Sequence, residues 1–314
     1  MKSLSTKDAQ LYRIERLCRL FGASKQAYYK YDENRLLTKI AQEDFALQFI
    51  REIRRKDPGI GGKKLWIMYQ REFGANQPMG RDRFESIIDK YGLKLRQRMR
   101  RPRTTDSTHN LPLYPNLTHS LIPKRPNELW VSDITYIPIW VSETDYEFGY
   151  LSLILDAYTE EIIGWSLAES LATKHTLEAL HMALRRIKEQ PSASLIHHSD
   201  RGCQYASHAY THCLQSHDIH ISMTERGDPK ENAQAERINS TVKNELFKGR
   251  RFSSIGQVRT ALKEAIDFYN TQRPHMSLDM RTPSQMAHHR GEVRKLWRSY
   301  RQEAIKRMAA ESHI

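Results

Sequence analysis

The hydrophobic and polar positions in the first part of the chain follow a helical pattern. Residues 11–31 show the apolar spacing of a helix, then a glycine, then Ser24 as the N-cap of a second short helix. A long helical stretch is expected at about 33–57, and the segments 63–74 and 81–93 predict a second pair of short helices around a glycine-containing turn. Two such pairs outline helix-turn-helix units that bind DNA, but short helical pairs are also common in α domains of other function.

From Leu129 onward, the pattern changes to apolar segments rich in β-branched and aromatic residues, which predict strands. The order is three strands, a helix, a strand, a helix, a short strand and a helix. This order predicts an α/β fold with a mixed sheet flanked by helices. The segments that carry it are LWVSDITYIPIW (129–140), GYLSLILDAYTEEIIGWSLAES (149–170), KHTLEALHMALRRIKEQ (174–190), ASLIHHSD (193–200) and SHAYTHCLQSHDIH (207–220).

A basic, proline-containing stretch separates the two parts. The sequence KLRQRMRRPR (94–103) holds six Lys or Arg residues, and we expect Arg98, Arg100 and Arg101 to contact phosphates. Four prolines follow between 109 and 130, where no periodicity is sustained. The predicted division is a helical DNA-binding region (1–93), a linker (94–125), an α/β domain (126–288) and a basic helical tail (289–314).

Charge is distributed unevenly along the chain. The formal net charge is +13, yet residues 1–125 hold 27 Lys or Arg against 13 Asp or Glu, whereas residues 126–314 hold 23 against 24. A basic region of this kind is the electrostatic signature of a protein that binds a polyanion such as double-stranded DNA. The alternative is a charged surface that serves only solubility.

Nothing in the sequence indicates a membrane protein or a secreted one. No apolar run approaches the roughly 20 residues needed to span a bilayer, and the N-terminus lacks the apolar core of a signal peptide. Cys18, Cys203 and Cys213 are too few and too scattered for a disulfide framework. We therefore expect a cytoplasmic protein with reduced thiols and no membrane partner.

Three acidic residues occupy positions that are awkward for a purely structural role. Asp133 lies within an apolar strand, Asp200 ends the strand LIHHSD, and Glu236 lies near the start of a helix. A buried charge must be compensated, and carboxylates from two strands and a facing helix suit a hard cation such as Mg²⁺. The alternatives are ion pairs with Lys or Arg, or stabilisation of Glu236 by the helix dipole. His197 and His198 lack the partner spacing of a zinc site, so we expect them to pack or to support the metal ligands through hydrogen bonds.

Several blocks of sequence resemble one known family. LWVSDITYI, HSDRGCQY and NAQAERINSTVKNEL are similar to the three signature blocks of the retroviral-integrase superfamily, with 35 residues between Asp200 and Glu236. The closest resemblance is to the transposases encoded by the second reading frame of the insertion-sequence-3 family. GIGGKKLW and MGRDRF resemble that family's upstream helical region, and YNTQRPHMSLDMRTP resembles its block after the catalytic helix. The resemblance extends from about residue 11 to residue 288.

This resemblance implies an RNase H-like catalytic domain preceded by an all-α helix-turn-helix DNA-binding region. It implies a transposase in which Asp133, Asp200 and Glu236 hold two Mg²⁺ or Mn²⁺ ions. Such an enzyme cuts a 3′ end of its element and transfers that strand. In the family, a circular intermediate forms and is later integrated. The implied partners are the terminal inverted repeats, target DNA, further copies of the chain assembled on DNA, and the protein of an upstream reading frame or its frameshift fusion. Such a protein would associate with the bacterial nucleoid when bound to DNA.

The helix that carries Glu236 presents further candidate residues. Lys243 follows Glu236 by seven residues, or two helical turns, and Asn232 precedes it by one turn, so all three share one face. The resemblance implies that this face contacts DNA, whereas spacing alone also fits an ordinary solvated Lys243. The family usually has Asp where this chain has Glu231, a change that bears on helix capping. The expected DNA contacts are Lys243, Asn232, Tyr205, Arg98, Arg100, Arg101, Lys63, Lys64, Arg81 and Arg83.

Two other functions are compatible with parts of this pattern. A structure-directed nuclease of the same fold would cut DNA without joining it, and a catalytically silent regulator would only bind it. Binding of terminal repeats by the N-terminal helices favours a transposase over a nuclease, and the three intact acids argue against a regulator. Asp156, in LILDAYT, also belongs to the resembling pattern; it is interpreted as a structural residue of the second strand or as a support for the metal ligands, not as a ligand itself.

Overall fold

The chain divides into two compact units, Met1–Gln48 and Phe49–Ile314, and the division falls inside helix α4 (Glu33–Lys56). The domain limits expected from the sequence remain a prediction. The computed structural model describes these residues: 14–30, 32–95, 111–143, 145–189, 194–225 and 231–311.

The first unit is helical. α2 (Ile14–Leu20) and α3 (Lys25–Tyr29) are joined by a tight turn in which Gly22 has a φ of 61°, a conformation that glycine adopts without strain. The backbone N–H of Ala23 closes the turn on the carbonyl of Cys18 at 2.8 Å. The first helical pair and the long helix that follows it are therefore confirmed.

A second helical pair opens the second unit. It consists of α5 (Gly62–Phe73) and α6 (Arg81–Lys90), as the sequence predicts. The core of the pair is aromatic, because the ring centroids of Tyr69 and Phe84 lie 5.3 Å apart and Phe49, near the end of α4, packs against Tyr69 at 5.5 Å. Contacts of this kind add to the stability gained by burial.

A five-stranded mixed sheet forms the centre of the second unit, in the order β3-β2-β1-β4-β5. β1 pairs antiparallel with β2 and parallel with β4, and β4 pairs parallel with β5. The mixed α/β architecture predicted from the sequence is confirmed. The strands are β1 (Leu129–Trp140), β2 (Tyr146–Asp156), β3 (Ile162–Ala168), β4 (Ile196–Ser199) and β5 (His220–Met223).

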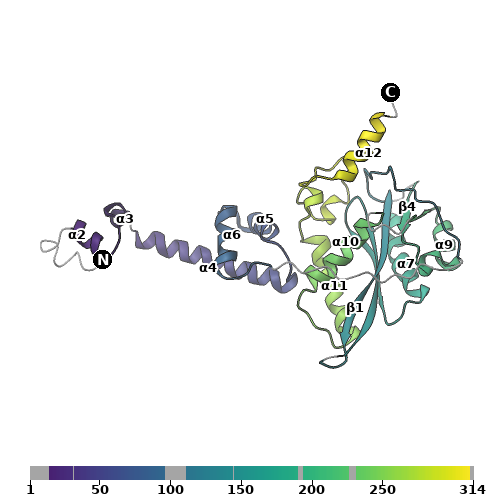
Figure 1. Ribbon diagram of the computed structural model, residues 1–314, viewed down its shortest axis with the longest axis horizontal. Helices are drawn as coiled ribbons and strands as arrows, with labels where there is room; N and C mark the ends of the chain where they lie inside the picture. Colours follow the sequence, from purple (N-terminus) through teal and green to yellow (C-terminus); the bar gives the residue numbers. More distant parts are fainter. Residues whose placement is uncertain are drawn as a thin grey trace. The chain divides into compact units, whose positions relative to one another are not determined.

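Helices cover both faces of this sheet. Figure 1 shows α7 and α9 on one side of β1, and α10 and α11 on the other. The α7 side holds a buried core that includes Trp130, Ile154 and Tyr210. None of the helices in the described parts is both long and apolar enough to cross a membrane. The helices are α7 (Thr173–Glu189), α8 (Cys203–Ala206), α9 (His208–Gln215), α10 (Ala233–Thr241), the π-helical turn η1 (Val242–Leu246), α11 (Ile255–Thr271), the 3-10 turns η2 (Met276–Leu278) and η3 (Ser284–Met286), and α12 (Tyr300–Glu311).

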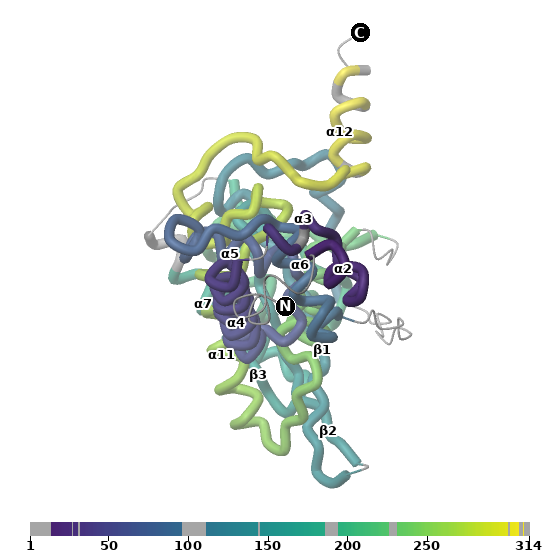
Figure 2. Tube along the Cα trace, turned by 90° about the vertical axis from the view of Figure 1, so that its left-hand side faces the viewer, coloured from purple at the N-terminus to yellow at the C-terminus, as the bar shows by residue number. Residues whose placement is uncertain are grey.

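The far ends of β1 and β2 form a long hairpin (Figure 2). Its register places Trp140 opposite Tyr146 and Tyr136 opposite Tyr150, so these side chains lie on one face of the ribbon. Their rings meet edge to face, with centroids 5.2 Å apart in the first pair and 5.4 Å in the second. Aromatic cross-strand pairs of this kind stabilise a two-stranded ribbon.

Candidate active site

The register of two neighbouring strands brings Asp133 and Asp200 to the same level. β1 and β4 run parallel, with Val131 opposite His198. The same register, continued by two residues, places Asp200 opposite Asp133, and matched residues of parallel strands point to the same face. Asp200 follows directly after β4, where its carboxylate accepts the backbone N–H of Gly202 at 2.9 Å.

The helix α10 is fastened to β1 on both sides of Glu236. Asn232 Nδ2 donates to the Ser132 carbonyl at 3.0 Å, and Asn239 Nδ2 donates to Asp133 Oδ2 at 2.9 Å. Positions 232, 236 and 239 share one face of a helix, so Glu236 lies on the face of α10 that meets Asp133. The sequence analysis missed Asn239, although its spacing of three residues from Glu236 was a usable signal.

Burial and like charges act together on Asp133. Burial first, and then the negative charge of Asp200, raise its pKa to about 7, with a smaller contribution from Glu236. The backbone N–H of Ile134, at 2.9 Å, and the Asn239 amide oppose this effect because they stabilise the charged form. Asp200 and Glu236 therefore both lie within electrostatic reach of Asp133.

The donor set of this site suits a hard divalent cation. Carboxylate oxygens are the ligands that Mg²⁺ and Mn²⁺ prefer, and a cation next to Asp133 would offset the repulsion that raises its pKa. Within the described residues, no three His, Cys, Asp or Glu side chains already stand close enough together to hold a metal ion. The chemistry of the residues fits such an ion, but their side chains are not yet close enough together to coordinate it.

Lys243 lies on a π-helical turn, which the sequence analysis did not predict. α10 ends at Thr241, and Val242–Leu246 form the turn η1. The Lys243 side chain is exposed; partial desolvation lowers its pKa, and the negative charge of Asp133 favours its charged form. The ammonium group of Lys243 is therefore close enough to Asp133 to interact with its charge. Single π-helical turns inside helices occur frequently at functional sites.

The chain matches known protein families over more than half of its length. One family described as integrase core domain matches residues 123–229, and a second with the same description matches residues 217–283. The 31 kDa protein of insertion element IS600 from Shigella sonnei is 34% identical over 273 residues, which cover 85% of this chain and 96% of that protein. The chain belongs to the integrase-core transposases of the insertion-sequence-3 family.

A further relative and a solved structure are also similar to this transposase. The transposase for insertion sequence element IS629 from Shigella sonnei is 28% identical over 279 residues, which cover 87% of this chain and 90% of that protein. Among solved structures, the HTLV-2 integrase catalytic core domain in complex with magnesium is 19% identical, with a TM-score of 0.39, over 52% of this chain and 98% of that one. Family membership and the observed strand order confirm the RNase H-like fold.

Two residues expected to contact DNA are buried in this transposase. Asn232 exposes 6% of its surface, and Tyr205 exposes 2%. The Tyr205 hydroxyl accepts a hydrogen bond from Ser132 Oγ at 3.0 Å, next to the residue that carries the first carboxylate. Both side chains support the site through packing and hydrogen bonds, and their contact with DNA stays a prediction.

The basic residues expected to contact DNA have different surroundings. Lys63 and Arg81 are exposed on the second helical pair, and Arg83 is half-buried. Lys64 is mostly buried, and its ammonium group pairs with Glu245 at 3.1 Å. The remaining three lie outside the described residues: Arg98, Arg100 and Arg101.

Buried polar residues near the carboxylates have structural contacts. His197 Nε2 meets the Tyr210 hydroxyl at 3.0 Å, and burial lowers the pKa of His197 to about 3, so its ring is neutral. His198 Nδ1 meets Ser222 Oγ at 2.8 Å. These contacts agree with the packing roles inferred for both histidines and with a structural role for Asp156. The Asp156 carboxylate accepts the backbone N–H groups of Asn127, Tyr158 and Thr159 at 2.7, 2.9 and 2.9 Å.

Glu231, where the family usually has Asp, lies at the end of the loop in front of α10. Its carboxylate accepts the backbone N–H of Glu225 at 2.8 Å, and its carbonyl meets His198 Nε2 at 3.1 Å. The N-cap position of α10 belongs to Asn232. The longer side chain of Glu231 therefore connects the two ends of the loop.

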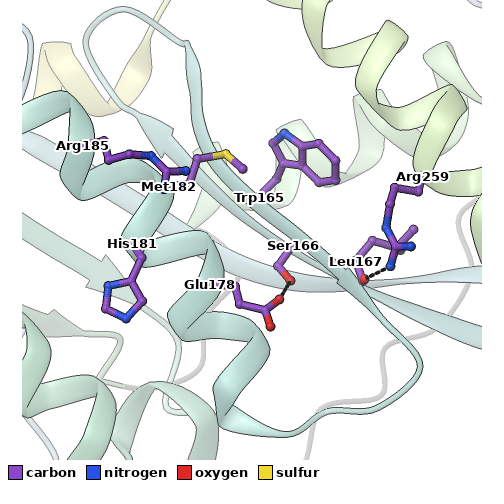
Figure 3. Close-up of a pocket in the computed structure, with 8 residues that line it drawn as sticks. All are labelled: Trp165, Ser166, Leu167, Glu178, His181, Met182, Arg185 and Arg259. Atoms are coloured by element: carbon purple, nitrogen blue, oxygen red, sulfur yellow. Dashed lines mark hydrogen bonds between the residues drawn. The ribbon is translucent and has the colours of Figure 1, made fainter.

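A surface hollow of about 420 Å³ lies between β3, α7 and α11 (Figure 3). Two interactions cross it: Ser166 Oγ donates to the Glu178 carboxylate at 2.7 Å, and Arg259 donates to the Leu167 carbonyl at 3.2 Å. None of the three candidate carboxylates lines this hollow. The hollow is therefore separate from the candidate active site.

Proposed function

We propose that this transposase cuts DNA at the 3′ ends of its own insertion element and transfers the cut strand, with Asp133, Asp200 and Glu236 as the ligands of the catalytic metal ions. The observation that carries the proposal is the double attachment of α10 to β1, where Asn232 and Asn239 bind the strand on either side of Glu236. The register of β1 and β4 adds Asp200 at the same level.

Two Mg²⁺ or Mn²⁺ ions held by these carboxylates would activate the attacking water or 3′-hydroxyl and stabilise the leaving oxygen. The residues of the chain keep the ligands oriented. The Ile134 N–H and the Asn239 amide each hold one oxygen of Asp133, and the Gly202 N–H holds one oxygen of Asp200. Hydrogen bonds that orient metal ligands in this way commonly affect metal affinity and activity strongly.

Lys243 is the basic group that supports a phosphate contact at this site. Its side chain is exposed and interacts with the charge of Asp133, so it can approach a DNA phosphate next to the carboxylates. Basic residues of the first 125 positions, among them Lys63 and Arg81, would hold the duplex of the terminal inverted repeats through phosphate contacts. Target DNA, further copies of the chain on paired ends, and an upstream-frame protein or fusion complete the proposed partners.

Cleavage of DNA ends by the purified protein tests this proposal. The substrate is a labelled duplex with the DNA that flanks the gene, in the presence of Mg²⁺. Asp133→Asn, Asp200→Asn and Glu236→Gln should each reduce cleavage to background and leave end binding intact, because each removes a metal ligand and not a phosphate contact. Glu264→Gln, at an exposed position of α11, is a matched control that should cut like the parent protein.

Each outcome of this assay has a distinct meaning. Substantial Mg²⁺-dependent cleavage by any of the three carboxylate variants would overturn the assignment of that residue. Loss of cleavage in Glu264→Gln would show that removal of any negative charge has this effect. Binding without cleavage by the parent protein, whatever the metal, would make the chain a DNA-binding regulator.

A further inference from the structure

A cluster of buried ionisable side chains lies between the helical pair α5–α6 and the η1 turn that carries Lys243. Its members are Asp57, Lys64, Glu245 and Arg273, whose side chains expose 0%, 17%, 19% and 7% of their surface. Burial of charge is costly unless each ion has a partner in good geometry. The proposed chemistry of the carboxylate site uses none of these four residues.

Glu245 is at the centre of this cluster. Its Oε1 accepts from Arg273 Nε at 2.7 Å and its Oε2 accepts from Arg273 Nη2 at 2.9 Å, so the pair is bidentate and geometrically specific. Lys64 Nζ donates to Glu245 Oε1 at 3.1 Å. A single carboxylate thus joins α5, the η1 turn and the loop that follows α11.

Arg273 is itself held by its neighbours in the block YNTQRPHM (269–276). Its Nη1 lies 3.0 Å from His275 Nε2, and its guanidinium carbon lies 5.3 Å from the centre of the Tyr269 ring. Burial keeps the pKa of His275 well below its ordinary value, so the neutral ring can accept this hydrogen bond. The block therefore builds a binding site for the Glu245 carboxylate.

The loop that leads from α4 into α5 also contacts the η1 turn through its backbone. The Gly59 N–H donates to the Glu245 carbonyl at 2.9 Å, and a side chain at position 59 would collide with the Glu245 backbone. Within α5 itself, Arg71 donates to the Met280 carbonyl at 2.7 Å. The helical pair is therefore attached both to the η1 turn and to the loop that contains Arg273.

We propose that this cluster is the connection through which the α5–α6 pair positions Lys243. Glu245 is a positioning residue, which Arg273 holds in the π-helical turn and which Lys64 joins to the helical pair. A π-helical turn is rare, and the contacts of this one through Glu245 come from Arg273 and Lys64, both outside the helix. The inference rests on the proposed function, because it takes Lys243 to contact the DNA strand next to the metal ligands.

Two neighbouring lysines of α5 provide the test. Lys64→Met removes the ion pair with Glu245, and Lys63→Met makes the same change one residue away at an exposed position. In strand joining by the full chain, Lys64→Met should lower the rate at saturating DNA about tenfold and leave the DNA concentration for half-maximal rate unchanged. Lys63→Met should instead raise the DNA concentration for half-maximal rate and leave the rate at saturating DNA unchanged. Lys64→Arg, which keeps the charge, should restore most of the rate.

Hydrogen exchange of the protein without DNA separates this inference from the proposed function. Backbone amides of Val242–Leu246 should exchange about tenfold faster in Lys64→Met than in the parent, and Lys63→Met should match the parent. Parental exchange in Lys64→Met overturns the connection, even if the parent protein joins no DNA at all. Faster exchange with a parental joining rate shows that the cluster is structural only. An increased half-maximal DNA concentration in Lys64→Met would make Lys64 a DNA contact and overturn the inference as well.

Discussion

Asp133→Asn should stabilise the metal-free protein while it removes catalysis. In the parent protein, burial and the charges of Asp200 and Glu236 raise the pKa of Asp133 from 3.8 to about 7. In this pH range the folded state binds more protons than the unfolded state, so the free energy of unfolding falls as pH rises from about 4 through about 7. The amide of the variant does not ionise, so its free energy of unfolding does not fall in this way as pH rises.

The size of the effect follows from the surroundings of Asp133. A shift of one pKa unit corresponds to about 1.4 kcal/mol, so the full shift of Asp133 corresponds to roughly 4 kcal/mol in the free energy of unfolding. Because Asp133 is only partly buried, solvent screening reduces the gain in the free energy of unfolding to about 1 to 2 kcal/mol. The hydrogen bond can also be kept, because Asn239 Oδ1 is buried with no hydrogen-bond partner among the described residues and can accept from the introduced amide after the Asn239 amide rotates.

Thermal unfolding in the presence of a chelator measures this gain. At pH 8, Asp133→Asn should unfold roughly 2 to 6 °C above the parent protein, and the difference should narrow towards pH 5. Added Mg²⁺ should raise the midpoint of the parent protein and have little effect on the variant. A variant that unfolds at or below the midpoint of the parent at pH 8 would refute the reasoning that the Asp133 carboxylate is charged and poorly solvated next to like charges.

Two further predictions concern DNA. Replacement of Arg98, Arg100 and Arg101 by Ala should weaken binding to all sequences alike and flatten its salt dependence, because about 0.9 counterion is released per phosphate contact; an altered sequence preference with the same salt slope would make this segment a base reader. Lys243→Ala should spare metal binding and reduce strand joining, Lys243→Glu should reduce joining further, and stability should change by no more than about 0.5 kcal/mol. Folded Lys243 variants that join DNA ends at the parental rate would show that this lysine is only a solvated residue.

Most elements of the fold could be predicted because their signals are local. The long apolar segment from Leu129 and the helical spacing after residue 33 match β1 and α4 closely. The order of strands in the sheet could not be worked out from periodicity, because the pairing of β1 with β4 joins residues 67 positions apart. Only the resemblance to a known family supplied that information.

In the candidate site, too, features that depend on neighbouring residues could be predicted from the sequence, whereas contacts between distant residues could not. Asp133 and Glu236 stood out because a charge in an apolar strand and an acid near a helix start are local anomalies. The contact of Lys64 with Glu245 joins residues separated by 181 positions, so a mostly buried lysine looked like a DNA contact in the sequence. The π-helical turn at Lys243 contains Glu245, whose partners Arg273 and Lys64 are distant in sequence, and α-helical spacing cannot show such a turn.

A change of metal preference at Asp200 tests the central claim, that the three acids are metal ligands, most directly. Asp200 lies directly after β4 and is half-buried, so a small side chain fits there. Thiolates favour softer ions than Mg²⁺, so Asp200→Cys should lose DNA end cleavage with Mg²⁺ and regain part of it with Mn²⁺ or Cd²⁺. Asp200→Ser, the matched control, should stay inactive with every ion. Cleavage by Asp200→Cys at the parental rate with Mg²⁺, or equal recovery of Asp200→Ser with the softer ions, would contradict the claim.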